Sequence, residues 1–124
     1  MAKPPDPLER LRKIIESWPE TREKLSHAAP TWWGGRKTFA TFHLDHHGDL
    51  GPTVWVKSTH EIQAELVETD AELFFVPPYV GVSGWLGVRL DRGADWEMIA
   101  GILEDGYRMV APKRAIRALD DGTD

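Results

Sequence analysis

Apolar residues recur every three or four positions in three segments of the chain, as they do along the buried face of a helix. The first segment covers residues 7–18, where Asp6 stands as a capping residue before Pro7 and Pro19 ends the pattern. Its predicted inward residues are Leu8, Leu11, Ile15 and Trp18. We therefore expect a first helix over residues 7–18 that places Trp18 in the core.

Two further helices are predicted in the same way. The second begins at the capping box Ser58-Thr59-His60-Glu61 and ends near Asp70. Its predicted inward residues are Ile62, Leu66 and Val67. The third begins after Asp95, and Pro112 ends or kinks it before two further turns over residues 112–119. Its predicted inward residues are Trp96, Ile99, Leu103, Tyr107 and Val110.

Short runs of β-prone residues predict the strands. Gly34-Gly35 joins Thr31-Trp32-Trp33 to a strand from Arg36 to about Leu44, and two glycines between such runs favour a hairpin. Phe39 lies on the opposite side of that strand from Phe42, which indicates a bulge or burial of both faces. Two more short strands are predicted at residues 53–57 and 73–76. The polar runs at residues 20–27 and 45–49 are interpreted as a connector and a turn.

The run from Phe75 to Leu90 is the most distinctive in the chain. Pro77 and Pro78 fix φ and remove two backbone donors, so this part is predicted to be a stiff, extended loop. The glycines at positions 81, 84 and 87 then allow sharp turns and close approach of another backbone or a ligand. Replacing Gly81 by valine is expected to cost stability if φ is positive there. A strand is predicted from Trp85, with Leu86, Val88 and Leu90 on one face and Trp85, Gly87 and Arg89 on the other.

The predicted element order is helix, strands, helix, strands, helix, which favours an α+β fold. In such a fold an antiparallel sheet carries the N- and C-terminal helices on one face. With 124 residues, the chain is expected to form a single domain over residues 1–124. Residues 1–5 and 120–124 are expected to be flexible tails.

Composition excludes several classes of site. The chain has no cysteine, which excludes disulfides, thiolate chemistry and cysteine-ligated zinc. Residues 1–6 lack the apolar core of a signal peptide, and no apolar run has the length of a membrane span, so we expect a cytoplasmic protein without membrane contact. The net charge of −5 gives no general attraction for nucleic acid, so such binding would require a local basic patch.

Five blocks of sequence together resemble the YjbR/MmcQ-like family of small bacterial proteins. The blocks are His27-Ala28-Ala29-Pro30-Thr31-Trp32, Gly35-Arg36-Lys37-Thr38-Phe39-Ala40, Pro77-Pro78-Tyr79-Val80-Gly81, Gly84-Trp85-Leu86-Gly87-Val88 and Tyr107-Arg108-Met109-Val110-Ala111-Pro112-Lys113-Arg114. The resemblance implies a CyaY-like, or frataxin-like, α+β fold related to the double-wing fold of a phage transcription factor. It also implies DNA binding, the label that members commonly carry. The Trp32-Trp33 pair departs from the family, where we expect one bulky residue.

Basic residues provide the first functional hypothesis, which is non-specific DNA binding. Between Asp105 and Leu119 there are four basic residues against one acidic residue, and Arg36-Lys37 stands at the predicted hairpin tip. The residues predicted to contact phosphates are Arg36, Lys37, Arg108, Lys113 and Arg114. A solvated helix end, neutralised by the acidic tail, explains the same pattern without a ligand.

The alternative hypothesis is a small-molecule or peptide site on the segment from Pro77 to Arg89. Its candidate residues are Tyr79, Ser83, Trp85 and Arg89, a set that combines apolar walls with a few polar groups. An enzyme is not indicated, because Gly81-Val82-Ser83-Gly84-Trp85 lacks the glycine that a nucleophile elbow requires at position 85. The glycines at 81, 84 and 87 likewise match neither the dinucleotide nor the P-loop spacing.

Histidines and aspartates between His43 and Asp49 include potential metal ligands within seven positions. A polar turn explains the same residues, and no further well-spaced ligand accompanies them. We therefore expect no metal, no other cofactor and no catalytic residues. The oligomeric state is left open by the sequence.

Overall fold

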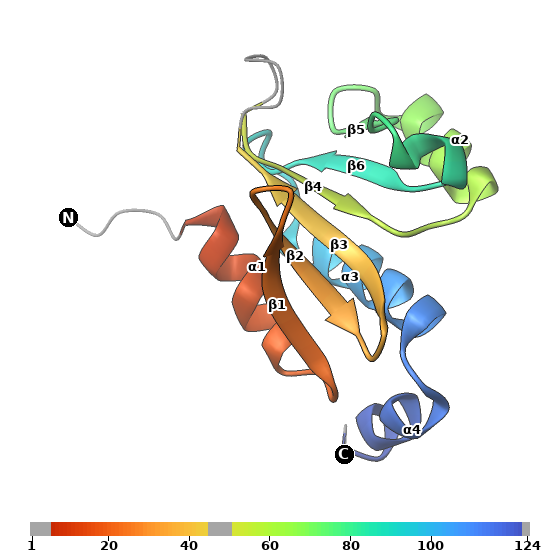
Figure 1. Ribbon diagram of the computed structural model, residues 1–124. Coiled ribbons are helices and arrows are strands. Elements are labelled where there is room, and N and C mark those ends of the chain that lie inside the picture. The colour runs from red at the N-terminus through yellow and green to blue at the C-terminus, as the bar shows by residue number, and fades with distance from the viewer. Residues whose placement is uncertain (1–5, 45–50, 123–124) are drawn as a thin grey trace.

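The protein is described from a computed structural model, which covers residues 6–44 and 51–122. The predicted α+β class is confirmed, because one antiparallel sheet of six strands is accompanied by four α-helices within those residues (Figure 1). The strand order is β1-β2-β3-β4-β6-β5. The strands are β1 (Thr21–Ser26), β2 (Ala29–Gly34), β3 (Lys37–His43), β4 (Thr53–Val56), β5 (Phe74–Phe75) and β6 (Leu86–Arg89). The helices are α1 (Pro7–Glu16), α2 (His60–Thr69), α3 (Trp96–Val110), α4 (Lys113–Asp121) and the 3-10 helix η2 (Val80–Ser83).

The hydrophobic core lies between the sheet and the helices α1 and α3. Leu11 and Ile15 of α1 and Ile99 and Leu103 of α3 are almost completely buried. The sheet contributes Phe39, Val54, Val56, Leu86 and Val88 to the same cluster. Because these elements bury one face of the sheet, the opposite face is left to form a site.

An aromatic cluster closes one end of this core. The rings of Trp18 and Tyr107 lie 5.1 Å apart between centroids, and Phe39 meets Tyr107 edge to face at 5.7 Å. The Tyr107 hydroxyl donates a 2.6 Å hydrogen bond to the Pro19 carbonyl oxygen, and burial raises the pKa of this phenol. The predicted burial of Trp18 is therefore confirmed, whereas Trp96 is only half-buried and lies beneath the Arg10 guanidinium.

The β2–β3 hairpin confirms the predicted irregularity and explains the tryptophan pair. The register shifts between Trp32 and Trp33, and a bulge at this point brings both Phe39 and Ala40 of β3 into the core. Trp32 is buried among the core residues, whereas Trp33 faces the other side of the sheet. Trp32 and Trp33 can therefore follow each other, because Trp32 packs in the core and Trp33 lies on the opposite face of the sheet.

Two sequence interpretations are corrected by the fold. The segment predicted as a polar connector, residues 20–27, contains the edge strand β1, which pairs with β2 along its whole length. It was missed because β1 has no apolar face: Glu23 pairs with Arg12 of α1, and Arg22, Lys24 and Leu25 are exposed. Helix α2 is capped by Thr59, not by the first residue of the predicted box, and its inward face is rotated, because Gln63 is buried while Ile62 is exposed.

The ends of the chain differ in part from the expected tails. Asp120 and Asp121 belong to α4, so the helix continues into the segment 120–124. Residues 1–5, the remaining expected tail, and the predicted turn at 45–49 lie outside the described residues. No described helix combines the length and apolar character needed to cross a membrane.

Candidate functional site

The candidate site is a hollow on the face of the sheet opposite α1 and α3. One row of paired residues crosses four strands on this face: Thr31 of β2, Thr41 of β3, Trp55 of β4 and Gly87 of β6. Cross-strand partners point to the same side of a sheet, so these side chains form a common floor. Phe75 of the edge strand β5 is the next partner in the row, and its ring covers Gly87 where a Cβ would stand.

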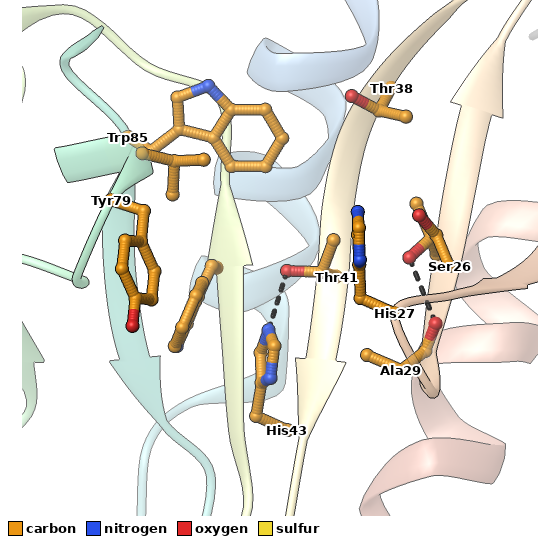
Figure 2. A pocket seen from close by; sticks show the side chains of 11 residues that line it. Ser26, His27, Ala29, Thr38, Thr41, His43, Tyr79 and Trp85 are labelled. Carbon is orange, nitrogen blue, oxygen red and sulfur yellow. Dashed lines mark hydrogen bonds between the residues drawn. The ribbon is translucent and has the colours of Figure 1, made fainter. Parts of the chain in front are cut away.

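The hollow has a volume of about 640 Å³. Figure 2 shows Tyr79 and Trp85 on one side, Ser26, His27 and Ala29 on the other, and Thr41 and His43 between them. None of the described residues that line it is acidic, lysine or arginine. Among those residues the polar groups are hydroxyls and two imidazoles, and aromatic rings provide much of the apolar surface.

The floor also includes an ordered histidine. The His43 imidazole stacks on Trp55 with ring centroids 3.7 Å apart and an interplanar angle of 24°. Its Nε2 shares a 3.0 Å hydrogen bond with the Thr41 hydroxyl (Figure 2). Stacking and hydrogen bonding together fix the imidazole plane, so the site has a preformed flat surface with a polar edge.

The wall formed by the segment after β5 contains a strained residue. Tyr79 has φ 66° and ψ −69°, and the Val80 amide donates a 2.7 Å hydrogen bond across it to the Pro78 carbonyl. These values define the rare γ-turn of positive φ, which costs a non-glycine residue on the order of 1–3 kcal/mol. The Tyr79 side chain is 78% exposed and stands at the rim of the hollow. The loop that Pro77 and Pro78 were predicted to stiffen therefore contains a strained backbone conformation at Tyr79, the residue that follows them.

The condition attached to the prediction for Gly81 is not met, because its φ is not positive. A Cβ at Gly81 would instead lie 2.6 Å from Val76 Cγ1, so a larger residue would require the Val76 side chain to move. Gly84 has the left-handed conformation, with φ 92°, at the point where the chain enters β6. Buried Gln63 holds the intervening residues, donating hydrogen bonds to the carbonyl oxygens of Gly81 and Trp85 at 2.9 and 2.6 Å.

The turn on the opposite side is also unusual. His27 and Ala28 connect β1 to β2, and both have positive φ, at 51° and 65°. A two-residue hairpin turn with two such values is ordinarily made by asparagine or glycine. The turn therefore holds the His27 backbone in a defined position beside the hollow. The sequence had predicted only a polar connector for this segment.

Of the four residues predicted for a ligand site, the structure brings two together. Tyr79 and Trp85 line the hollow, whereas Ser83 is exposed and not among the lining residues. Arg89 lies outside it as well: its guanidinium donates to the carbonyl oxygens of Ala71 and Glu72 and covers the Phe75 ring at 4.8 Å. The side chain of Arg89 supports the edge strand β5.

Sequence reasoning missed most of the floor. Its members are Thr31, Thr38, Thr41, His43 and Trp55. The alternation of Thr41 and His43 with buried residues of β3 could have indicated that both lie on one face of that strand. Which residues of β2 and β4 lie beside them depends on the register between the strands. The bulge opposite Trp32 and Trp33 changes that register by one residue, and the sequence indicated an irregularity in β3 without fixing which residues of β2 it would displace.

The residues predicted to contact phosphates are divided between two environments. Arg108 pairs with Glu104 at 2.8 Å and with Asp120 at 2.6 Å, and Arg114 forms two 2.7 Å hydrogen bonds with Glu20. The Arg114 hydrogen bonds lower the pKa of the Glu20 carboxyl, so the pair is fully charged at neutral pH. Both arginines are thus engaged within the protein.

The other three predicted residues are Arg36, Lys37 and Lys113, which are exposed and make no ion pair among the described residues. The hairpin tip and the start of α4 adjoin, because a Cβ at Gly35 would lie 2.8 Å from Pro112 Cδ. The structure therefore brings these three cations to one end of the molecule.

Potential metal ligands are not gathered in the described part of the chain. No group of three or more histidine, cysteine, aspartate or glutamate residues is placed there to hold a metal ion. Of the residues considered for metal binding, only His43 is described, because the others lie between residues 45 and 49.

Comparison with known proteins agrees with this architecture. The chain superimposes on the crystal structure of Deinococcus radiodurans protein DR2400, a DUF419 domain, with a TM-score of 0.73. The match has 16% sequence identity and covers 93% of this chain and 91% of that chain, which shows a shared fold. No curated protein matches the chain. Residues 16–109 match the YjbR family profile, a span that includes the sheet, α2, η2 and nearly all of α3. The chain therefore belongs to the YjbR family.

Proposed function

We propose that this protein binds a small, flat, aromatic molecule in the hollow on the open face of its sheet. The observation that carries the proposal is the shape and lining of the hollow, with about 640 Å³ of space enclosed by Trp55, Tyr79 and Trp85. Small-molecule sites in proteins have volumes of roughly 300–1,000 Å³ and apolar walls with a few placed polar groups. The proposal concerns binding and includes no reaction.

The polar groups around the rings favour an uncharged, hydrogen-bonding ring system. Thr38 and Thr41 present hydroxyl groups, and His27 and His43 present imidazoles. Each of these groups donates or accepts a hydrogen bond in its neutral form. A flat molecule that stacks on an aromatic wall and carries nitrogen or oxygen atoms at its edge satisfies both kinds of surface.

Ligand-observed NMR by saturation transfer tests the proposal with three probes: adenosine, benzamide and glucose. We expect saturation of the two aromatic probes and none of glucose, because only flat rings stack against the walls. Replacement of Tyr79 by alanine should reduce the aromatic signals several-fold without changing the fold, since its side chain is 78% exposed.

The matched control is Val82→Ala, which removes a side chain that is 83% exposed on the same segment but does not line the hollow. It should leave the signals unchanged. Thr41→Trp, which fills the floor, should abolish them. Binding of neither aromatic probe, or equal loss of signal in the Tyr79 and Val82 variants, would contradict the proposal.

A second candidate function is non-specific DNA binding, and one observation favours it. The exposed cations Arg36, Lys37 and Lys113 lie next in sequence to Gly35 and Pro112, where the β2–β3 turn meets the start of α4. A hairpin tip with basic residues reaches a phosphate backbone readily, and it would act as a wing does in the related fold. Arg108 and Arg114 contribute less to this candidate than the sequence suggested, because Glu104, Asp120 and Glu20 already engage them.

A further inference from the structure

We propose that the ligand of the hollow is a nucleotide, with its base in the hollow and its phosphate bound by Arg22 and Lys24. This inference rests on the proposed function and specifies its ligand class. It comes from β1, which carries Arg22 and Lys24 on the open face and contributes Ser26 to the lining of the hollow.

The register places both cations on the same face as the floor. Lys24 is paired with Thr31, a lining residue, and adjacent strands lie only about 4.8 Å apart. Arg22 is paired with Trp33, which is in turn paired with Thr38, another lining residue. Partners across a sheet share a face, so Arg22 and Lys24 lie on the same face as the hollow, on the strand whose residue Ser26 lines it.

Trp33 holds the two cations together. Its ring lies 5.2 Å from the Arg22 guanidinium carbon and 6.0 Å from the Lys24 ammonium nitrogen. Cation–π contact at these distances orients the side chains while leaving their hydrogen-bond donors directed outward. A guanidinium beside an ammonium group is a suitable pair for a phosphate, which accepts from both.

The acidic residues near this pair are engaged elsewhere. Glu23, between the two cations in sequence, points to the helical face and forms hydrogen bonds of 2.8–3.1 Å with Arg12. Glu20 is bound by Arg114. Arg22 and Lys24 make no ion pair among the described residues, so their positive charges remain available on an otherwise acidic protein.

The hollow and the cation pair together match the two parts of a nucleotide. The hollow has aromatic walls and hydroxyl and imidazole groups, and none of its described lining residues is lysine or arginine, which suits a base. The charges stand on β1, the strand whose last residue, Ser26, lines the hollow, which suits a phosphate at the other end of a ribose. A ligand with a charged group on the ring itself would be desolvated within the hollow without a partner, at considerable cost.

Isothermal titration calorimetry with adenosine, adenosine monophosphate and inorganic phosphate tests this assignment. We expect the monophosphate to bind on the order of tenfold more tightly than adenosine, because charge-assisted hydrogen bonds are added. Inorganic phosphate alone should bind far more weakly than the nucleotide. Added salt should weaken binding of the nucleotide and leave adenosine almost unaffected.

The double variant Arg22→Gln with Lys24→Gln should remove the advantage of the monophosphate and retain adenosine binding. Its thermal midpoint should stay close to that of the parent, because both side chains are exposed. Arg10→Gln is the matched control: the Arg10 guanidinium lies 4.8 Å from the Trp96 ring, a similar contact away from the hollow. It should leave the tenfold preference intact.

The outcomes separate this inference from the proposed function. Equal affinity for adenosine and its monophosphate, or a preference that survives the double variant, would overturn the phosphate assignment and leave the aromatic site standing. Tighter binding of an oligoadenylate than of the monophosphate would assign this face to a nucleic-acid strand instead. If no aromatic probe binds at all, the proposed function itself fails.

Discussion

Two residues of the 79–84 segment show how backbone conformation shapes the wall of the hollow. Tyr79 takes up a strained γ-turn, and Gly84 takes up a left-handed conformation five residues later. Local residue types gave a partial guide to this geometry: they predicted a stiff loop with turning glycines, but not which residue would have positive φ. That assignment depends on tertiary contacts, since the backbone of residues 58–60 lies against Gly84.

At the residue scale we predict that Gly84→Ala destabilises the protein by roughly 2–4 kcal/mol. The new Cβ would lie 3.0 Å from the His60 amide nitrogen and 3.2 Å from the Ser58 carbonyl oxygen, and backbone atoms cannot move aside cheaply. Gly93→Ala is the control, because Gly93 has φ 71° with open space around it. It should cost only about 1 kcal/mol for the left-handed backbone. Urea unfolding measures both, and equal destabilisation would show that the contact with residues 58–60 is unimportant.

At the element scale, periodicity predicted the helices well and their faces less well. The spacing of Ile99, Leu103 and Tyr107 matches the buried face of α3, whose long apolar stripe dominates its packing. Helix α2 has no comparable stripe, so a polar residue decides its orientation: Gln63 turns inward to bind the backbone of the 79–85 segment. Apolar periodicity cannot report such a residue, because its burial is offset by hydrogen bonds that form only in the folded protein.

We predict that Gln63→Leu destabilises the protein by roughly 1–3 kcal/mol, although leucine is more hydrophobic and favours helices. The change removes the side-chain donor that binds the carbonyl oxygens of Gly81 and Trp85, although the Gly84 amide still donates to the Gly81 oxygen at 3.0 Å. Ile62→Gln, the reverse change at the neighbouring position, should alter stability by less than about 0.5 kcal/mol, since Ile62 is 40% exposed. Chemical denaturation compares the two variants. A larger destabilisation in the Ile62 variant would contradict this prediction and would support the sequence-based view that Ile62 lies on the inward face of α2.

At the scale of the whole molecule, a net charge of −5 conceals a division between paired and unpaired cations. Arg12, Arg108 and Arg114 connect α1 to β1, α3 to α4, and α4 to the residue before β1. These ion pairs are exposed and contribute little to stability individually, but they remove acidic groups from the surroundings of the remaining cations. Composition alone could not separate the two groups, because the pairs join residues as far apart as Glu20 and Arg114.

The unpaired cations at the hairpin end lead to the prediction that distinguishes the second candidate function. If Arg36, Lys37 and Lys113 bind phosphates, duplex DNA should bind weakly, without sequence preference and with a steep dependence on salt. Lys37→Ala combined with Lys113→Ala should weaken every duplex about equally. It should also reduce the slope of log affinity against log salt by roughly 2, because each lysine that no longer binds a phosphate lowers the slope by about one. Fluorescence anisotropy between about 50 and 200 mM salt measures the slope.

Lys13→Ala provides the comparison, because it removes an exposed cation from α1, outside the cluster that Gly35 and Pro112 bring together. The slope should then be unchanged if phosphate binding depends on that cluster. A slope reduced equally by the Lys13 variant would mean that any exposed cation attracts the duplex. Absence of binding at the lower salt would exclude the hairpin end as a DNA site, whereas adenosine monophosphate would still bind through Arg22 and Lys24, which lie on a different strand. The two sites can thus be tested on one protein, since each depends on cations that the other does not use.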